Sequence, residues 1–152
     1  AAGHVEAALN AIRALPEASI VKVNMLEAAA WSHAAVTSAD AVREVRRSMS
    51  VDTLVVTMGR DGALADTPTG TLRIGTAPVI GHFPVGSGDA FLAGFVAARY
   101  NGLGTEECLV HGVACGAQST QHLGAGLIDR AQVDRLLGEI EVDLPAISAE
   151  VT

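Results

Sequence analysis

Apolar positions along the chain follow two patterns, one typical of helices and one typical of strands. Residues 4–15 carry apolar side chains at helical spacing and stop at Pro16, so we expect a first helix there. The runs 19–24 and 52–59 are short, apolar and rich in β-branched residues, which predicts two buried strands. A short helix is expected to start at Met25, directly after the first strand.

A further amphipathic helix is predicted between these strands, over residues 39–49, with Thr37 or Ser38 capping its first turn. Its inner face is expected to carry Val42, Val45 and Met49. Its solvated face is expected to carry Arg43, Glu44, Arg46 and Arg47.

The second half of the chain predicts a hairpin followed mostly by helices. In order, we expect strands at 62–67 and 70–76 turned at 68–70, a strand or extended connector at 77–83, helices at 88–100, 105–122 and 129–140, and a last strand at 141–144. Strands that alternate with helices indicate an α/β fold, with a parallel or mixed sheet covered by helices. Such sheets bind ligands at the carboxyl ends of their strands, so the residues there are the first candidates for chemistry.

The amino-acid composition excludes several classes of function for this chain. The chain has 152 residues, 49% of them hydrophobic, which suffices for one domain with a core. No run reaches the ~18 apolar residues of a membrane span, and residues 1–10 lack a signal-peptide pattern, so we expect a cytoplasmic protein without a membrane partner. The net charge of −7, with Lys22 as the one lysine, argues against nucleic acid as a partner. Cys108 and Cys115 fall ~10 Å apart along one predicted helix, too far for a disulfide, so we expect buried reduced thiols.

Three strand ends carry unusual residues: Asn24 with Glu27, Gly59–Gly62, and Gly86–Asp89. Each also has a purely structural explanation. Asn24 and Glu27 have the spacing of a helix cap and its capping-box partner. Gly59–Gly62 suits a tight turn as well as a ligand contact. The helix dipole favours an acid such as Asp89 in a first turn.

The stretch FPVGSGDAFLAGF, residues 83–95, does not fit three known glycine-rich or catalytic motifs. A Walker A loop needs a lysine after the glycines, whereas Lys22 lies inside a strand. The dinucleotide fingerprint needs a third glycine where Phe91 stands. A nucleophile elbow needs glycines at the positions of Val85 and Asp89. Metal-site spacing of His and Cys residues is also missing from the sequence.

What remains is a strand–loop–helix unit whose first backbone amides can bind an anion. A carboxylate at the same place would repel phosphate if anion binding were its only task. It makes sense if Asp89 takes a proton from a hydroxyl while the amides hold the charge developing on a phosphoryl group. On the residues alone, a general base and a structural aspartate remain open alternatives.

Four segments then resemble the PfkB (ribokinase-like) family of carbohydrate kinases, in the order that the family has them. VGSGDAFLAGF is similar to its second signature, and VKVNMLEA is similar to its K-P-N-x-x-E segment. VVTMGRDGAL resembles its strand and T-x-G-x-x-G turn, and GVACGAQSTQHLGAG resembles the carboxy-terminal helix and loop beside the adenine. These segments cover nearly the whole chain, whereas the family's first signature is absent. The resemblance implies a ribokinase-like, Rossmann-like layered sheet flanked by helices.

The resemblance also implies roles for individual residues. Asp89 matches the general base that activates the sugar hydroxyl, and Gly86, Ser87 and Gly88 match the anion hole around the transferred phosphoryl group. Glu27, together with Asn24, matches the pair that organises Mg²⁺ and the phosphates. The nucleotide-binding set that the family implies is Asn24, Thr57, Gly59, Gly62, Gly124, Ala125 and Gly126.

Two departures and one missing part qualify the match. Val23 stands where the family usually has proline, and Val85 replaces a threonine common before the glycine. Val85 with the later LGAG is more like the phosphosugar branch, the 1-phosphofructokinase and tagatose-6-phosphate kinase types. The amino-terminal half, which carries the sugar-binding residues and a lid in the family, has no counterpart. We therefore expect residues 1–152 to be the nucleotide-binding carboxy-terminal half of such a kinase.

The expected function is ATP-dependent and Mg²⁺-dependent phosphoryl transfer to a hydroxyl of a sugar or sugar phosphate, incomplete in these residues alone. A non-catalytic nucleotide-binding or interaction protein derived from such a kinase is the alternative. A dinucleotide-binding oxidoreductase is a weaker one, because the fingerprint fails. Besides ATP and the sugar substrate, the expected partners are a second copy of the chain or a complementary amino-terminal half.

Overall fold

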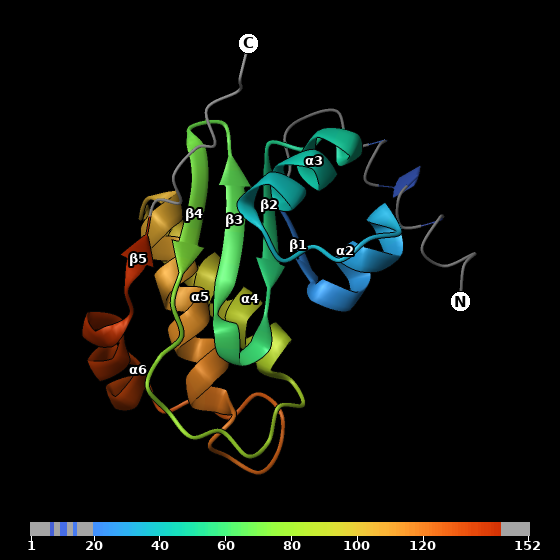
Figure 1. Cartoon of the computed structure of the whole chain (residues 1–152). Coiled ribbons are helices and arrows are strands. Elements are labelled where there is room, and N and C mark those ends of the chain that lie inside the picture. Colours follow the sequence, from blue (N-terminus) through green and yellow to red (C-terminus); the bar gives the residue numbers. More distant parts are fainter. Residues whose placement is uncertain (1–6, 8–9, 12–13, 15–19, 144–152) are drawn as a thin grey trace.

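The computed structural model describes residues 7, 10–11, 14 and 20–143 of the chain (Figure 1). The helix expected over 4–15, with its end at Pro16, falls largely outside the described residues. The sheet consists, in order, of β1 (Ile20–Asn24), β2 (Thr53–Thr57), β3 (Ala63–Thr67), β4 (Gly70–Ile74) and β5 (Val142–Asp143). β1 pairs with β2 in parallel and every later pair is antiparallel, so the sheet is mixed. The hairpin predicted around residues 68–70 is confirmed, with Thr67 opposite Gly70.

Helices cover both faces of this sheet, which confirms the predicted α/β class (Figure 1). One face carries α2 (Met25–Ser32) and α3 (Ala39–Met49), and the other carries α4 (Ser87–Tyr100), α5 (Thr105–Ser119) and the shorter α6 (Arg130–Leu136). β2 shows why both faces need a cover. Leu54 and Val56 pack into the α2–α3 core, while Val55, between them, packs into the α4–α5 core. Successive strand residues point to opposite faces, so an unbroken apolar run is the pattern of a strand buried on both sides.

Small residues let α4 and α5 approach closely. A side chain at Gly94 would put its Cβ 2.6 Å from the sulfur of Cys115, and one at Gly112 would meet the ring of Phe91 at 2.9 Å. Cys115 and Cys108 are both buried and free, as the sequence predicts. Burial raises the pKa of both thiols, so the reactive thiolate form is disfavoured.

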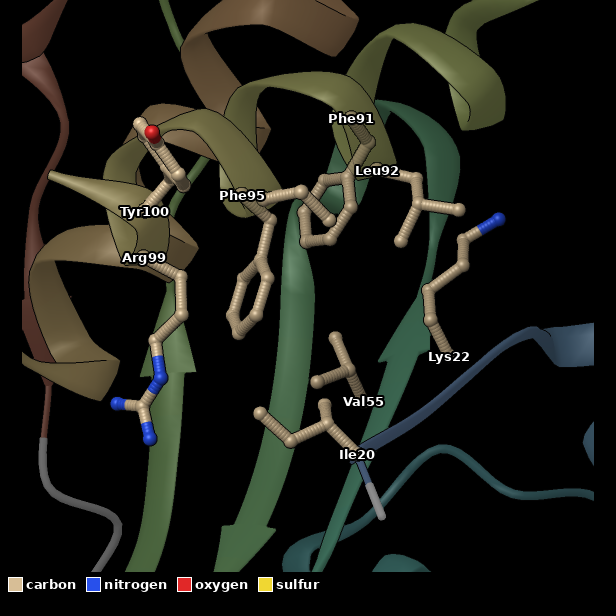
Figure 2. A pocket seen from close by; sticks show the side chains of 9 residues that line it. Ile20, Lys22, Val55, Phe91, Leu92, Phe95, Arg99 and Tyr100 are labelled. Carbon is tan, nitrogen blue, oxygen red and sulfur yellow. The ribbon is translucent and has the colours of Figure 1, made fainter.

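β1 is an edge strand, and the prediction that it is a buried strand is wrong. Within residues 20–143 it pairs only with β2, and Ile20 is 39% exposed. Beside it lies a cavity of about 520 Å³ between β1, β2 and α4. Figure 2 shows Phe91 and Phe95 pointing from α4 toward Val55 and Ile20. The segment 77–83 also forms no strand, so its connector alternative holds.

α3 begins at the predicted cap, since Ser38 Oγ accepts the backbone N–H of Ala41. Its inner face is also as predicted, with Val42, Val45 and Met49 buried. The expectation that all four charged residues are solvated is wrong for two of them. Arg43 and Arg46 are half-buried, because both reach Asp66 on β3.

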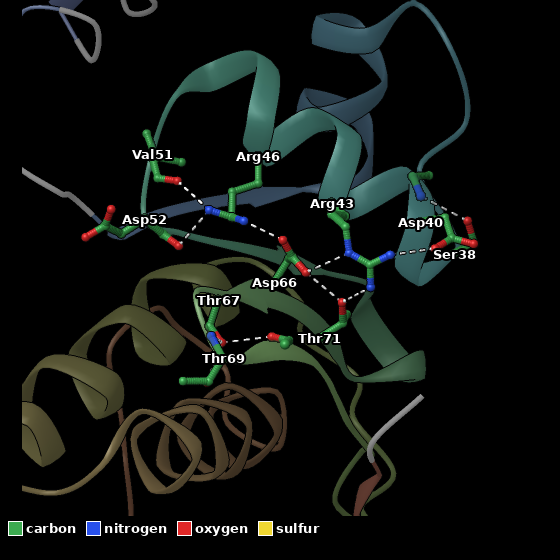
Figure 3. A network of polar contacts seen from close by, with 12 residues as sticks. Ser38, Asp40, Arg43, Arg46, Val51, Asp52, Asp66, Thr67, Thr69 and Thr71 are labelled. Carbon is green, nitrogen blue, oxygen red and sulfur yellow. Dashed lines mark hydrogen bonds and ion pairs between the residues drawn. The ribbon is translucent and has the colours of Figure 1, made fainter. Parts of the chain in front are cut away.

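Asp66 is the centre of a polar network between α3 and the hairpin (Figure 3). Its carboxylate is 1% exposed and accepts hydrogen bonds from Arg46 Nε and, at 2.6 Å, from Thr71 Oγ1. Arg43 Nε lies 3.6 Å from the same carboxylate, and its Nη2 donates to Thr71 Oγ1 at 3.0 Å. A buried carboxylate held by two guanidinium groups is costly to remove, because both cations stay half-buried without the charge that they share.

Asp66→Ala is therefore expected to lower the free energy of unfolding by about 3 kcal/mol. Asp40→Ala is the matched control, because Asp40 pairs with the same Arg43 at 2.8 Å but is 62% exposed. The control should cost less than about 1 kcal/mol, since a solvated ion pair contributes little. Urea denaturation of both variants measures the difference. Equal losses would show that Asp66 acts as an ordinary surface charge.

Candidate functional site

A cavity of about 700 Å³ opens where β1 and β2 end and α4 begins. Six of the residues predicted from the sequence line it: Asn24, Thr57, Gly59, Gly62, Ser87 and Gly88. Asn24 and Thr57 are the last residues of two parallel neighbours and face each other in the register. Their carboxyl ends therefore meet at one edge of the sheet, which is where sheets of this kind bind ligands.

The lining is strongly biased in charge. Lys22 and Arg60 contribute to it, while its described lining residues include no aspartate or glutamate. That bias runs against the whole chain, whose net charge is −7. Two cations in a concave site without a carboxylate favour an anionic ligand.

The first turn of α4 adds backbone donors to this site. Gly86 is the N-cap with φ of 84°, a left-handed conformation that glycine adopts without strain, and no side chain caps the helix. Ser87 N–H donates to Pro84 O at 3.1 Å. Helix geometry leaves the amides of Gly88 and Asp89 without helical acceptors, so they are available to an anion at the positive end of the helix dipole.

Asp89 follows the cavity-lining Gly88 directly and is exposed in this first turn. It is not among the residues that line the cavity. Asp89 is thus next to a lining residue in sequence but is not itself part of the lining. This position is compatible with both the general base and the dipole-favoured aspartate.

Lys22 and Arg60 are the charged lining residues that sequence reasoning missed. Lys22 lies so close to α4 that a Cβ on Gly88 would meet its Nζ at 2.9 Å. A usable signal was present, because residues two apart on a strand share a face and Lys22 stands two before Asn24. Arg60 belongs to the turn η1 (Gly59–Asp61) and had no comparable signal.

The glycines after β2 serve a tight turn and line the cavity at the same time. Met58 N–H donates to Gly62 O at 2.8 Å, which closes the turn. A side chain at Gly62, where φ is 81°, would put its Cβ 2.1 Å from the carbonyl oxygen of Ile74. Glycine is therefore required here by the hairpin itself, whatever the cavity binds.

Asn24 and Glu27 form the capping box that the sequence left open. Asn24 Oδ1 accepts the Glu27 N–H at 2.9 Å, and Glu27 Oε2 accepts the Asn24 N–H at 2.8 Å. Glu27 is exposed and does not line the cavity. Its second oxygen, Oε1, takes no part in these two bonds.

The loop with Gly124, Ala125 and Gly126 does not line the cavity but lies directly behind the start of α4. A Cβ on Gly86 would come within 2.6 Å of the Ala125 Cβ. Gly86 itself is also outside the lining. The loop therefore packs against the start of α4, and the described residues do not place it in the cavity wall.

Comparison with known proteins identifies the family. Residues 4–131 match the model of the pfkB family carbohydrate kinases, so the chain belongs to this family. Fructoselysine 6-kinase of Escherichia coli K12 is 33% identical over 73 residues, which are 48% of this chain and 28% of that protein. ATP-dependent 6-phosphofructokinase isozyme 2 of the same bacterium is 27% identical over 133 residues, covering 85% of this chain and 43% of that one.

Solved structures agree with the family and with the predicted ribokinase-like fold. Escherichia coli phosphofructokinase-2 in complex with potassium has a TM-score of 0.77 at 25% identity, over 88% of this chain and 44% of that chain. Arabidopsis thaliana ribokinase, complexed with ribose and ATP, shares the fold with a TM-score of 0.71 at 23% identity, over 78% and 40% of the two chains. The chain thus spans less than half the length of these relatives.

Proposed function

We propose that this chain binds the phosphates of ATP in the 700 Å³ cavity and contributes the phosphoryl-transfer half of a sugar or sugar-phosphate kinase. The observation that carries the proposal is the cavity itself. It combines two cations with the uncapped start of α4 at the carboxyl end of a parallel strand pair, and its described lining residues include no carboxylate. Phosphoryl transfer demands this combination, because its main catalytic requirement is to position and neutralise negative charge.

The proposed roles follow from the positions. The amides of Gly88 and Asp89, with Gly86 and Ser87 shaping the turn, hold the charge that develops on the transferred group. Lys22 lies close to the same turn, and Arg60 lines the same cavity, so both are proposed to contact the polyphosphate. Asp89 accepts the proton of the acceptor hydroxyl, at the border where such a hydroxyl meets the anion site.

Mg²⁺ fits the residues at the end of β1. This ion prefers oxygen ligands and usually takes one or two carboxylates together with substrate phosphates and water. Glu27 Oε1 and the Asn24 amide offer such oxygens beside the cavity, and the described residues contain no cluster of three or more His, Cys, Asp or Glu. We propose that Glu27 acts on Mg²⁺ indirectly, through water; the ion would neutralise phosphate charge.

Glu27→Gln is expected to raise the Mg²⁺ concentration needed for half-maximal ATP binding several-fold while the fold stays intact. Glutamine still accepts the Asn24 N–H, so the capping box survives the change. Titration of Mg²⁺ at fixed ATP measures the effect, with the exposed Glu44→Gln on α3 as the charge-matched control. If Glu27→Gln lowers the stability of the fold and leaves the Mg²⁺ dependence of ATP binding unchanged, Glu27 is only a cap.

The acceptor site is proposed to lie in the part of the kinase that the relatives have beyond this chain's match. Two observations support this. The match with this chain covers only 43% of the 6-phosphofructokinase isozyme. In addition, an apolar face lies exposed beside β1. There Leu92, Val96 and Tyr100 are 47%, 55% and 92% exposed around the 520 Å³ cavity (Figure 2). Such a face favours a polypeptide cover. We propose the complementary sugar-binding half, with a second copy of this chain as the alternative cover.

The proposal also covers the type of sugar acceptor and the cellular location. A phosphosugar acceptor of the fructose or tagatose type is favoured by Val85 and the LGAG stretch. The described part of the chain contains no helix that is long and apolar enough to cross a membrane. A cytoplasmic location is proposed because carbohydrate kinases use ATP.

Lys22→Ala tests the proposed nucleotide site most simply. The variant is expected to bind Mg²⁺–ATP roughly 10- to 100-fold more weakly, because a hydrogen bond to a charged group contributes ~1.5–3 kcal/mol. Isothermal titration of ATP, ADP and NAD against the chain measures this. Arg47→Ala is the control, since it removes one exposed positive charge from α3.

The titration separates a nucleotide-phosphate site from a dinucleotide site. Binding of ATP with Mg²⁺ that depends on Lys22 and not on Arg47 supports the kinase and also a non-catalytic nucleotide-binding protein. Sugar-phosphate turnover by the chain combined with the complementary sugar-binding half then distinguishes those two. Preference for NAD, or equal losses in both variants, would contradict the proposed site.

A further inference from the structure

Gln118, in the last turns of α5, is a fully buried polar residue outside the cavity. Its Oε1 accepts the backbone N–H of Asp129 at 3.0 Å. Its Nε2 lies 2.6 Å from His122 Nε2. The side chain therefore connects the two ends of the loop between α5 and α6, the loop that contains Gly124–Gly126.

The bond to Asp129 also fixes the bond to His122. Because a backbone N–H can only donate, the Gln118 oxygen must face Asp129, and the amide NH₂ must face the imidazole. His122 Nε2 then accepts, which places the proton of the neutral ring on Nδ1. Both polar ends of a side chain with 0% exposure are thus satisfied by the loop alone.

The loop held in this way supports the anion-binding turn. Ala125 lies against Gly86, where even a methyl group would approach to 2.6 Å. The other side of that turn is tied to the same end of α5, since Thr120 O accepts the N–H groups of His82 and Phe83 at 2.9 Å each. Asp129 continues the chain of contacts by capping α6 through Gln132 N–H at 3.2 Å.

We propose that Gln118 is a positioning residue for the phosphate site: it holds the 121–129 loop against Gly86 and so fixes the first turn of α4. The part of this inference that concerns ATP rests on the proposed function. The part that concerns the loop rests on the contacts alone. A buried amide whose bonds both go to one loop stabilises that loop in a single position, because losing either partner leaves a polar atom buried without a bond.

Hydrogen exchange of the chain, combined with ATP titration, tests the proposal. In Gln118→Met, which keeps the length of the side chain and removes its hydrogen bonds, the Asp129 amide should exchange at least tenfold faster. The amides of residues 121–128 should also exchange faster, while the amides of β2 and β3 should keep their exchange rates. The Kd for Mg²⁺–ATP should rise 3- to 10-fold.

Two further variants keep the test decisive. Ser119→Ala is the matched control, because Ser119 is buried next to Gln118 and its hydroxyl donates to Gly116 O within its own helix; the change should leave loop exchange and Kd unchanged. His122→Ala removes one of the two bonds and is expected to speed exchange of 121–128 less than Gln118→Met does. It decides the matter if Gln118→Met does not fold.

The outcomes distinguish the claim about the loop from the claim about ATP binding. Faster loop exchange with weaker ATP binding supports the proposal, and a double variant Gln118→Met/His122→Ala should then resemble Gln118→Met alone. Unchanged loop exchange, an unchanged Kd, or the same response in Ser119→Ala would overturn it. If the unmodified chain binds no ATP, the proposed function fails, while the exchange of Asp129 still decides whether Gln118 holds the loop.

Discussion

Asp89→Asn is expected to lower the rate of phosphoryl transfer by roughly 10²–10⁴-fold in the kinase assembled with its sugar-binding half. Asparagine has nearly the same shape and cannot take the hydroxyl proton. ATP binding by the chain should survive or become slightly tighter, because one negative charge near the phosphates is lost. Coupled measurement of ADP release gives the rate, and titration gives the affinity.

Asp61→Asn is a suitable comparison for this variant, since Asp61 lies in the turn beside the cavity but is not among its lining residues. It should change turnover little. The split between rate and affinity also separates the two explanations of Asp89. Near-normal turnover together with a loss of stability would leave Asp89 as a first-turn aspartate that serves only the helix.

The chain by itself is expected to bind ATP weakly and to transfer no phosphoryl group to fructose 1-phosphate, tagatose 6-phosphate or free sugars. Holding both reactants in line can lower an enzymatic barrier by ~7–11 kcal/mol, and a site that holds one reactant does not provide this. Adding the complementary sugar-binding half should restore transfer. Radiolabelled ATP detects the product at very low turnover.

The apolar face at β1 gives this prediction a second readout. Leu92→Ser and Val96→Ser should reduce self-association or binding of the complementary half, while leaving ATP affinity unchanged, because both residues line only the smaller cavity. Vigorous sugar phosphorylation by a monomeric chain of these 152 residues would be incompatible with the half-enzyme proposal. The acceptor site would then have to be built from residues assigned here to the core and the connectors.

Local sequence signals predicted much of this fold. The hairpin at 68–70, the Ser38 cap and the inner face of α3 are where the pattern placed them, because each depends on residues close in the chain. The Asn24–Glu27 capping box was also readable from spacing. Grouping Asn24, Thr57 and Gly88 at one cavity followed from the rule for strand ends together with the family resemblance.

The errors have a common physical origin, since they depend on contacts between distant segments. Arg43 and Arg46 were expected in solvent, because nothing in the sequence of α3 indicates that Asp66 on β3, 20 or more residues later, pairs with them. β1 was expected to be buried because its apolar pattern is that of a covered strand, although nothing in residues 20–143 pairs with its outer edge. Arg60 was not predicted, because only the geometry of the turn η1 places it in the lining of the cavity.

Nuclear magnetic resonance of the uniformly ¹⁵N-labelled chain, titrated with Mg²⁺–ATP, tests the central claim most directly. It detects weak binding and reports each amide separately. We expect the largest shifts at Ser87, Gly88 and residues 57–62, with no change around Asp66. Shifts confined to the 520 Å³ cavity near Phe95, or none at millimolar ATP, would contradict a phosphate site at the start of α4.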